Sequence, residues 1–268
     1  MSGVGTYRAA IAIGDTPIGV RCARQDFIRM LERRYAGFMV APADAGIQLD
    51  VDIVEGPEVI ADEDLEVSCA AGRWTMTRGD FRAEWDPEAL RGRVRQEVLP
   101  YAIDAVLRIM HSLVLAESGE GFLLHSASAI RNGRAFLFSG VSGAGKTTIS
   151  RLAPADATLL SDEISYVRLI GERYFAFGTP FAGDLGISGE KVMAPLHATY
   201  FLKKGDRNRV SPVSPAAAVS TLLRNVLFFA DDERLVEKVF QTACEFVSRV
   251  PVFELTFRPD EEVWNLIR

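Results

Sequence analysis

The strongest chemical signal in the chain is a glycine-rich segment that ends in a lysine and two threonines. Residues 140–148 read Gly-Val-Ser-Gly-Ala-Gly-Lys-Thr-Thr and match GxxxxGK[ST], the pattern of a phosphate-binding loop. Glycines permit the positive φ angles with which consecutive backbone N–H groups wrap a phosphate, and the N-terminus of a following helix attracts the same anion. We therefore expect nucleotide phosphates to contact Gly140, Ser142, Gly143, Ala144, Gly145, Lys146, Thr147 and Thr148.

Two side chains of this segment have separate expected roles. Lys146 reaches the β- and γ-phosphates, and Thr147 offers its hydroxyl to Mg²⁺. The alternative is a chance glycine-rich turn. An apolar strand over residues 135–138 before the loop and a helix over residues 147–152 after it are the surroundings that a phosphate-binding loop requires, and they favour nucleotide binding.

Two acidic residues follow the lysine after a single short helix. Pro154 ends that helix early, and a short apolar strand over residues 158–160 leads into Ser161, Asp162 and Glu163. Acidic residues at the end of a strand beside a phosphate loop hold Mg²⁺ or accept the proton of an attacking hydroxyl. The alternative interpretation is a solvated turn.

A histidine precedes the lysine at the end of an apolar strand. His125 follows Phe122, Leu123 and Leu124. A lone histidine is most often structural, so the residue types leave both a structural role and contact with substrate or phosphate open. His111, expected on a helix face, and His197 are weaker candidates.

Together, His125, the loop that begins at Gly140, and the acidic pair after Ser161 resemble the catalytic domain of HPr kinase/phosphorylase, a family related to ATP-dependent phosphoenolpyruvate carboxykinase. The resemblance covers about residues 121–258. Within it, residues 178–183 and 194–202 look like segments of HPr-kinase-like proteins found beside peptide-modifying enzymes. The resemblance implies an α/β fold with a P-loop-containing mixed-sheet catalytic domain, ATP and Mg²⁺ as cofactors, and transfer of a phosphate to a hydroxyl.

The resemblance also implies a role for each matching residue. Lys146 would hold the β- and γ-phosphates, and Thr147 would hold Mg²⁺ together with Asp162 or Glu163. Asp162 would accept the hydroxyl proton, and His125 would orient that transfer. HPr kinases carry two aspartates where this chain has Asp162 and Glu163, so which carboxylate is the base stays open. The glycine-rich signature loop of the phosphorylase is not found, which argues against phosphorolysis and against HPr as substrate.

Three functions fit these observations. The first is an Mg-ATP-dependent kinase that phosphorylates Ser or Thr of a small protein or peptide. The second is a small-metabolite kinase of the carboxykinase-related type, and the third is a non-catalytic ATP-binding recognition module. Retention of Lys146, Thr147, Asp162 and His125 together argues against the third.

Phosphoryl transfer requires further cations and exclusion of water around the reacting groups. The glycine-rich segment 178–193 is either a lid or clamp over the substrate or a plain surface loop. Candidate cations, which are otherwise solvated surface charges, are Lys191, Lys203, Lys204 and Arg224.

The elements that must position these residues follow from changes in hydrophobic period. The first third is β-rich, with strands over residues 7–20, 47–53 and 65–85 and a short helix from an N-cap at Asp26 to a stop at Gly37. A helix over residues 100–117 links the two halves. We expect a smaller β-rich α+β subdomain over residues 1–99, with a role in substrate recognition, and an HPr-kinase-like domain over residues 100–268.

The second half begins with a hairpin and ends with helices. Asn132 and Gly133 join two apolar strands within residues 121–139, and this dipeptide is a strong hairpin signal. Helices are predicted over residues 214–228 and 232–248, a strand over residues 252–258, and a last short helix from Pro259.

Composition limits the class of protein. The 268 residues are 48% hydrophobic and carry a formal net charge of −6, so a sizeable core is expected and nonspecific nucleic-acid binding is not. Three widely separated cysteines indicate neither a zinc site nor a disulfide framework. Charged residues interrupt the apolar stretch 102–124, and the N-terminal residues lack a signal sequence. We expect a soluble cytoplasmic protein without a membrane partner, whose oligomeric state stays open.

Overall fold

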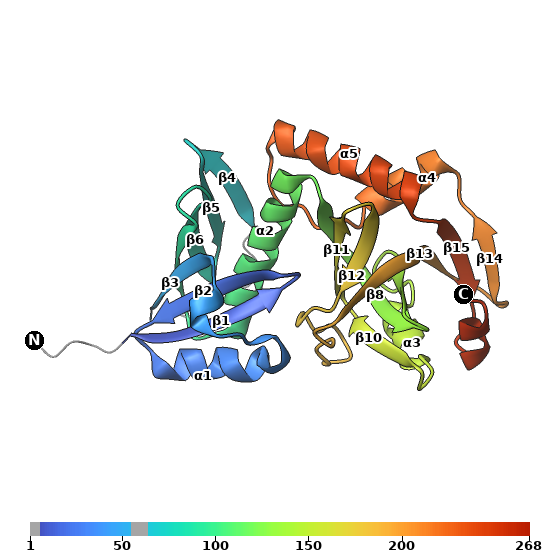
Figure 1. Ribbon diagram of the computed structural model, residues 1–268, viewed down its shortest axis with the longest axis horizontal. Helices are drawn as coiled ribbons and strands as arrows, with labels where there is room; N and C mark the ends of the chain where they lie inside the picture. Colours follow the sequence, from blue (N-terminus) through green and yellow to red (C-terminus); the bar gives the residue numbers. More distant parts are fainter. Residues whose placement is uncertain (1–5, 55–63) are drawn as a thin grey trace, which may run out of the picture. The chain divides into compact units, whose positions relative to one another are not determined.

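The computed structural model describes residues 6–54 and 64–268 and divides into two compact units. The first unit comprises residues 1–113 and 228–233, and the second comprises residues 114–227 and 234–268. The division falls inside helix α2 (Pro100–Ser118), after Leu113, whereas the sequence predicted a boundary before this helix. Each unit holds one sheet with parallel and antiparallel neighbours, so the fold is mixed α/β (Figure 1).

The sheet of the first unit has the strand order β1-β2-β3-β7-β6-β5-β4. The pairs β2–β3 and β3–β7 are parallel, and the others are antiparallel. Helix α1 (Gln25–Arg34) contacts β1 and β2, and the 3-10 turns Ala36–Phe38 and Pro42–Asp44 follow it. The strands are β1 (Tyr7–Ile13), β2 (Thr16–Cys22), β3 (Ile47–Ile53), β4 (Glu66–Ala70), β5 (Arg73–Arg78), β6 (Phe81–Asp86) and β7 (Arg91–Gln96).

Two features of the first unit differ from the sequence prediction. Asp26 lies in the first turn of α1, and the N-cap is Arg24. Strand β7 was not predicted, because arginines alternate with Gly92, Val94 and Gln96 and only Val94 supplies a buried apolar side chain. Pairing with β3 and β6 on its two sides forms this strand despite the weak pattern.

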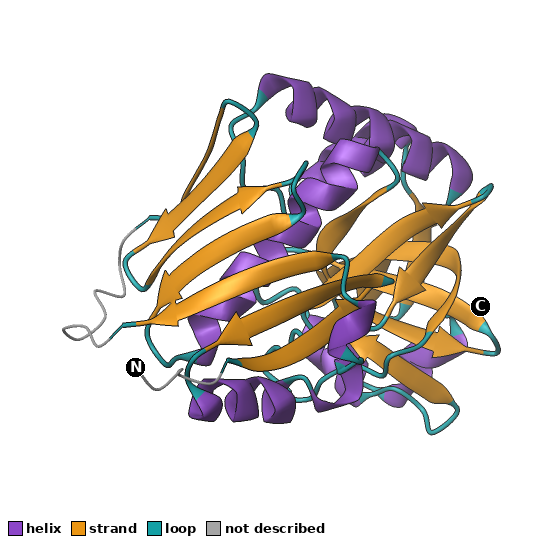
Figure 2. Cartoon of the chain, turned by 60° about the vertical axis from the view of Figure 1, so that its left-hand side comes forward, coloured by secondary structure: helices purple, strands orange, loops and turns teal. Residues whose placement is uncertain are grey.

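The sheet of the second unit follows the order β10-β8-β11-β12-β13-β15-β14, and β9 pairs with β8 and β13. The helices are α3 (Lys146–Arg151), α4 (Pro215–Leu223) and α5 (Glu233–Arg249), with a 3-10 helix over Glu261–Asn265. Strands, drawn in orange in Figure 2, outnumber the helices in both units. Those of the second are β8 (Gly121–Arg131), β9 (Arg134–Ser139), β10 (Ala157–Ser161), β11 (Ile164–Ile170), β12 (Arg173–Phe177), β13 (Met193–Lys204), β14 (Arg209–Pro212) and β15 (Val252–Phe257).

The predicted hairpin is confirmed and contains the strand that leads to the glycine-rich loop. Asn132 and Gly133 have φ angles of 52° and 71°, as a two-residue turn between β8 and β9 requires. β9 is buried on both faces: Ala135 and Leu137 pack in the cluster beneath α4 and α5, and Phe136 and Phe138 pack in the cluster beneath α3. In Figure 1, α4 and α5 lie above the strands of this unit and α3 lies below them. Burial on both faces explains the continuous apolar run.

Helix α4 ends at Leu223, earlier than the predicted end at residue 228. The chain beyond it pairs with β8 instead: the backbone N–H of His125 donates to the Asn225 carbonyl at 2.7 Å, and Leu227 N–H donates to Leu123 at 2.9 Å. This segment therefore fixes the backbone from Leu123 to His125. In residues 6–54 and 64–268, no helix combines the length and apolar character needed to cross a bilayer.

Candidate functional site

The glycine-rich loop lies where parallel strands of the second unit end together. β13 runs parallel to both β9 and β15, and the loop begins directly after Ser139 of β9. Gly143 and Gly145 have φ angles of 76° and 114°, which side chains disfavour. A Cβ on Gly145 would lie 2.7 Å from the ring of Phe257 at the end of β15. Both conformation and close packing therefore require glycine at position 145.

Lys146 is the first residue of α3 and is only 7% exposed. Its Nζ donates a hydrogen bond to the Gly140 carbonyl at 3.1 Å, which turns the side chain back across the loop. Burial lowers the pKa of the ammonium below its ordinary value of 10.5, while the carboxylates of Glu163 and Asp184 act in the opposite direction. The two carboxylates therefore favour the charged form of this buried ammonium, which lies at the C-terminal end of the loop.

The acidic pair lies in a bulge between two strands that follow the same edge of β8. β10 and β11 both pair antiparallel with β8, and residues 161–163 join them with a shift of register. The Ser161 hydroxyl accepts the backbone N–H groups of Glu163 and Ile164 at 3.2 and 2.9 Å. Ser126 N–H donates to the Glu163 carbonyl at 3.1 Å. The serine therefore stabilises the bulge that carries the acidic pair.

Asp162 is 4% exposed, and both of its carboxylate oxygens accept backbone N–H groups. Gly183 donates to Oδ1 at 2.8 Å, and Leu185 donates to Oδ2 at 3.0 Å. The sequence predicted this carboxylate as base and metal ligand. The structure directs it to the two amides that flank Asp184, so it fixes the position of that residue.

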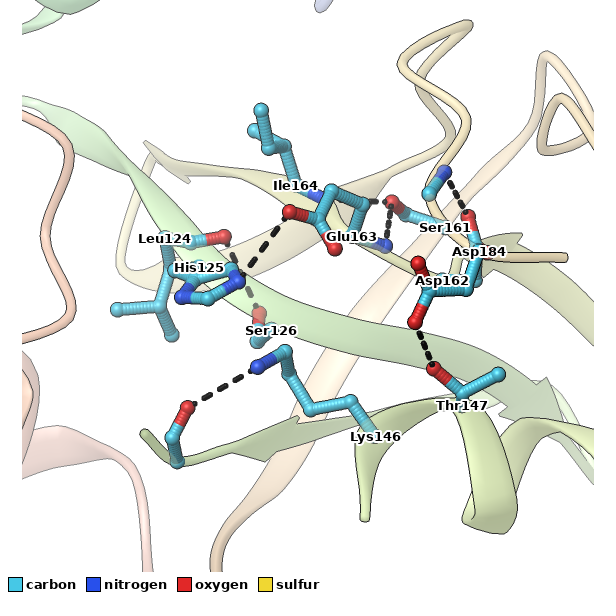
Figure 3. Close-up of polar contacts among 12 residues, drawn as sticks. Leu124, His125, Ser126, Lys146, Thr147, Ser161, Asp162, Glu163, Ile164 and Asp184 are labelled. Carbon is cyan, nitrogen blue, oxygen red and sulfur yellow. Dashed lines mark hydrogen bonds and ion pairs between the residues drawn. The ribbon is translucent and has the colours of Figure 1, made fainter. Parts of the chain in front are cut away.

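The carboxylate of Asp184 contacts Thr147, and sequence reasoning missed this residue. The Thr147 hydroxyl donates to Asp184 Oδ2 at 3.4 Å, a long contact, as Figure 3 shows. Gly183 beside it packs closely on the acidic pair, since a Cβ there would lie 2.8 Å from Glu163 Cβ and 3.1 Å from Asp162 Oδ2. One signal in the sequence could have identified Asp184: it is an acidic residue inside the glycine-rich segment 178–193.

That segment is held against the sheet along much of its length. The buried Thr179 hydroxyl donates to the Ile164 carbonyl at 2.6 Å, and Thr179 N–H donates to Leu160 at 3.0 Å. A Cβ on Gly189 would lie 1.7 Å from the Leu160 carbonyl oxygen. These contacts make the segment a fixed support for Asp184 in this structure.

His125 contacts Glu163, the second residue of the acidic pair. Its Nε2 lies 3.3 Å from Glu163 Oε1, and the two side chains are 29% and 35% exposed. In Figure 3 these side chains point toward each other. The Ser139 hydroxyl donates to the His125 carbonyl at 3.1 Å, so the residue just before the loop also contacts the histidine. A partly exposed histidine–carboxylate pair can hold or move a proton.

The side chains of five residues therefore lie near one another: Lys146, Thr147, His125, Glu163 and Asp184. Asp162 supports this group by accepting the backbone N–H groups on both sides of Asp184. The additional predicted cations lie elsewhere on the surface or beside this group. Lys203 pairs with Glu254 at 3.8 Å, and Arg224 is exposed just before Asn225, whose carbonyl holds the His125 amide. Within the described ranges, Lys191, Lys204 and Arg224 form no ion pair.

The donor set suits a hard divalent cation. Hydroxyl and carboxylate oxygens of Thr147 and Asp184 are ligands that Mg²⁺ accepts, and this ion is commonly held by one or two protein groups together with substrate phosphates and water. No group of three His, Cys, Asp or Glu side chains placed to hold a metal occurs among the residues that the structure describes.

Comparison with known proteins shows similarity to one family model and to solved structures. The family model of SynChlorMet cassette protein ScmC matches residues 98–267, which is more than half of the chain. No curated protein matches. Among solved structures, the Hpr(Ser) kinase/phosphatase from Coxiella burnetii is similar with a TM-score of 0.31 and 12% sequence identity, covering 54% of this chain and 85% of that chain.

Proposed function

This chain belongs to the family of the SynChlorMet cassette protein ScmC, and we propose that it is an Mg²⁺- and ATP-dependent phosphotransferase that acts on a hydroxyl group. One observation carries the proposal: a buried lysine ends a glycine-rich loop between a strand and a helix, and the Asp184 carboxylate contacts the neighbouring Thr147 hydroxyl. Residues 140–148 in a strand–loop–helix setting form the nucleotide phosphate site. We propose that this loop is a P-loop.

The loop side of the site binds the nucleotide. Backbone N–H groups of residues 142–147 would surround the phosphates, and the Lys146 ammonium would neutralise charge on the transferred group. Thr147 Oγ1 and the Asp184 carboxylate lie within hydrogen-bonding range of each other. These two groups would hold Mg²⁺. When bound, Mg-ATP supplies the phosphoryl group, and the chain's own residues orient it.

Glu163 is the stronger candidate for the base that accepts the hydroxyl proton. Its carboxylate is partly exposed and contacts His125, whereas both oxygens of Asp162 already accept backbone N–H groups. His125 Nε2 would orient the Glu163 carboxylate toward the acceptor hydroxyl. This assignment differs from the role that the resemblance to HPr kinases implies for Asp162: Glu163 would move the proton, and Asp162 would support the segment that carries Asp184.

A peptide or small protein with a Ser or Thr hydroxyl is the proposed acceptor. The support is the spacing of His125, the loop lysine and the acidic pair, which resembles HPr kinases. The partly exposed pair of His125 and Glu163 agrees with a hydroxyl presented from a chain segment rather than a fully enclosed small molecule.

The test is incubation of the purified protein with γ-labelled ATP, Mg²⁺ and the peptides encoded by neighbouring genes, followed by intact mass measurement. A peptide that gains one phosphate with the wild-type protein, and none with Lys146→Ala, supports the proposal. Binding of Mg-ATP without transfer to any peptide or metabolite would refute phosphotransfer and leave a recognition module.

A further inference from the structure

The sheet of the first unit has one charged face and one apolar face. Along the neighbouring strands β3, β7 and β6, the residues Leu49, Val94 and Ala83 are buried on one side. The alternate positions on the other side carry charges. Two cross-strand rows result: Asp50, Arg93 and Glu84 in the first, and Asp52, Arg95 and Arg82 in the second.

The second row places two arginines directly opposite each other. Like charges at such positions destabilise a sheet. The nearby carboxylates are already used: Asp52 pairs with Arg93 at 2.6 Å, and Glu84 lies 3.5 Å from Arg82 on its own strand. Arg95 forms no ion pair within residues 6–54 and 64–268. An external carboxylate would relieve the repulsion between Arg82 and Arg95.

These arginines border a groove on the charged face. A hollow of about 550 Å³ is lined by Asp52, Val54, Arg82, Glu84, Arg93 and Arg95. A second hollow of about 270 Å³ shares Glu84 and Arg93 and continues along β7 to Arg91. The groove therefore follows β6 and β7 and has Arg91, Arg93 and Arg95 along one side.

The chemistry of the cations indicates the ligand. No lysine occurs in residues 1–113, so every cation of this face is an arginine, whose planar fork binds a carboxylate through two hydrogen bonds. Arg91, Arg93 and Arg95 occupy every second position of β7 and repeat at about 6.8 Å, the spacing of alternate side chains in an extended peptide.

We propose that this groove binds an extended acidic peptide segment, with one carboxylate between Arg82 and Arg95 and the next ones along β7. A nucleic acid fits less well, because Asp52, Glu84 and Asp86 line the same groove: a peptide can place uncharged residues opposite them, whereas a nucleic acid carries a phosphate at every nucleotide. The arginines are well exposed, with 65% and 73% of the Arg82 and Arg93 side chains accessible, so the binding is weak and sensitive to salt.

This proposal concerns the first unit alone and does not depend on the phosphotransferase proposal, since binding is measured without nucleotide. The experiment uses the full chain and a fluorescein-labelled peptide with Glu at alternate positions, in low salt, with fluorescence anisotropy as the readout. The same peptide with Gln in place of Glu is the control. The Glu peptide is expected to bind at least about tenfold more tightly than the Gln peptide, and added salt is expected to weaken it.

Three variants separate a docking role from a structural one. Arg95→Ala and Arg82→Ala are expected to weaken binding of the Glu peptide at least about tenfold. Arg29→Ala removes an exposed arginine from helix α1 and leaves binding unchanged. Each variant is checked by thermal melting.

A charge reversal gives the sharpest outcome. Arg95→Glu places a carboxylate opposite Arg82 on one side and opposite Asp52 on the other, so the gain and the loss in stability oppose each other, and a folded variant is expected to lose binding of the acidic peptide. Each of three outcomes would overturn the proposal. The acidic peptide could still bind to Arg95→Glu, the Glu and Gln peptides could bind equally, or a single-stranded oligonucleotide could bind as tightly as the Glu peptide.

Discussion

At the scale of single residues, Lys146 decides nucleotide binding in the proposed function. Lys146→Ala removes the buried ammonium at the head of the loop and is expected to abolish stabilisation by Mg-ATP. For the wild type, nucleotide at one hundred times its Kd adds about 2 to 3 kcal/mol to the free energy of unfolding. Thermal melting with and without Mg-ATP measures the effect, and Lys191→Ala, at an exposed position, is the matched control. An unchanged shift in Lys146→Ala would remove the loop from the proposed site.

The acidic pair allows a second test at this scale, because its two carboxylates have different surroundings. Glu163→Gln keeps the shape of the side chain and removes the base, so transfer is expected to fall by a factor on the order of 10² or more while Mg-ATP binding persists. Asp162→Asn replaces an acceptor of two backbone N–H groups, and is expected to lower the free energy of unfolding by about 1 to 3 kcal/mol.

Turnover assays and urea unfolding of both variants distinguish these roles. If Glu163→Gln turns over normally while Asp162→Asn loses transfer without losing stability, Asp162 is the base, as the resemblance to HPr kinases implies.

At the scale of elements, the junction between the glycine-rich loop and α3 depends on close packing against β15. Gly145→Ala combines a φ of 114° with a Cβ at 2.7 Å from the Phe257 ring. We expect a loss of about 1 to 3 kcal/mol in unfolding free energy from the strained backbone, together with loss of stabilisation by Mg-ATP.

Gly171 provides the control for this prediction. It also has a positive φ, 60°, in the turn between β11 and β12, but a Cβ there would meet no atom within 4 Å. Gly171→Ala is therefore expected to lower the melting temperature modestly and to keep the response to Mg-ATP. Equal loss of that response in both variants would contradict the role of the loop junction.

At the scale of the whole molecule, folding stability is expected to depend on a buried histidine in α2. Burial lowers the pKa of His111 from 6.5 to about 4, and the side chain is 1% exposed. Below pH 6.5 the unfolded chain therefore binds a proton that the folded chain excludes, so stability falls with pH until about pH 4. The decrease between pH 7 and pH 5 is about 2 kcal/mol.

Urea unfolding at the two pH values checks this expectation. His111→Leu should remove the difference that the histidine causes, whereas carboxylates that titrate near pH 4 contribute alike to both proteins. An identical dependence on pH in wild type and variant would show that His111 titrates equally in the folded and unfolded states.

Much of the local structure was predicted from the sequence, because its signals are short-range. The turn residues Asn132 and Gly133 predicted the β8–β9 hairpin, and the apolar run of β9 before a glycine-rich loop predicted the strand–loop–helix order around Lys146. Strand β7 was missed because its pairing partners, rather than its own side chains, stabilise it.

The arrangement of the candidate site was decided by tertiary structure. The sequence alone determined that Lys146, Thr147, His125 and an acidic pair are present at spacings suited to phosphate chemistry. It did not show that Asp162 turns to the amides of Gly183 and Leu185, or that Asp184 lies beside Thr147. Those contacts join residues far apart in the chain, and they form because the segment that carries Asp184 packs too closely for side chains at Gly183, against the acidic pair, and at Gly189, against β10. Local residue patterns carry no information about such packing, since it depends on which distant backbone atoms meet.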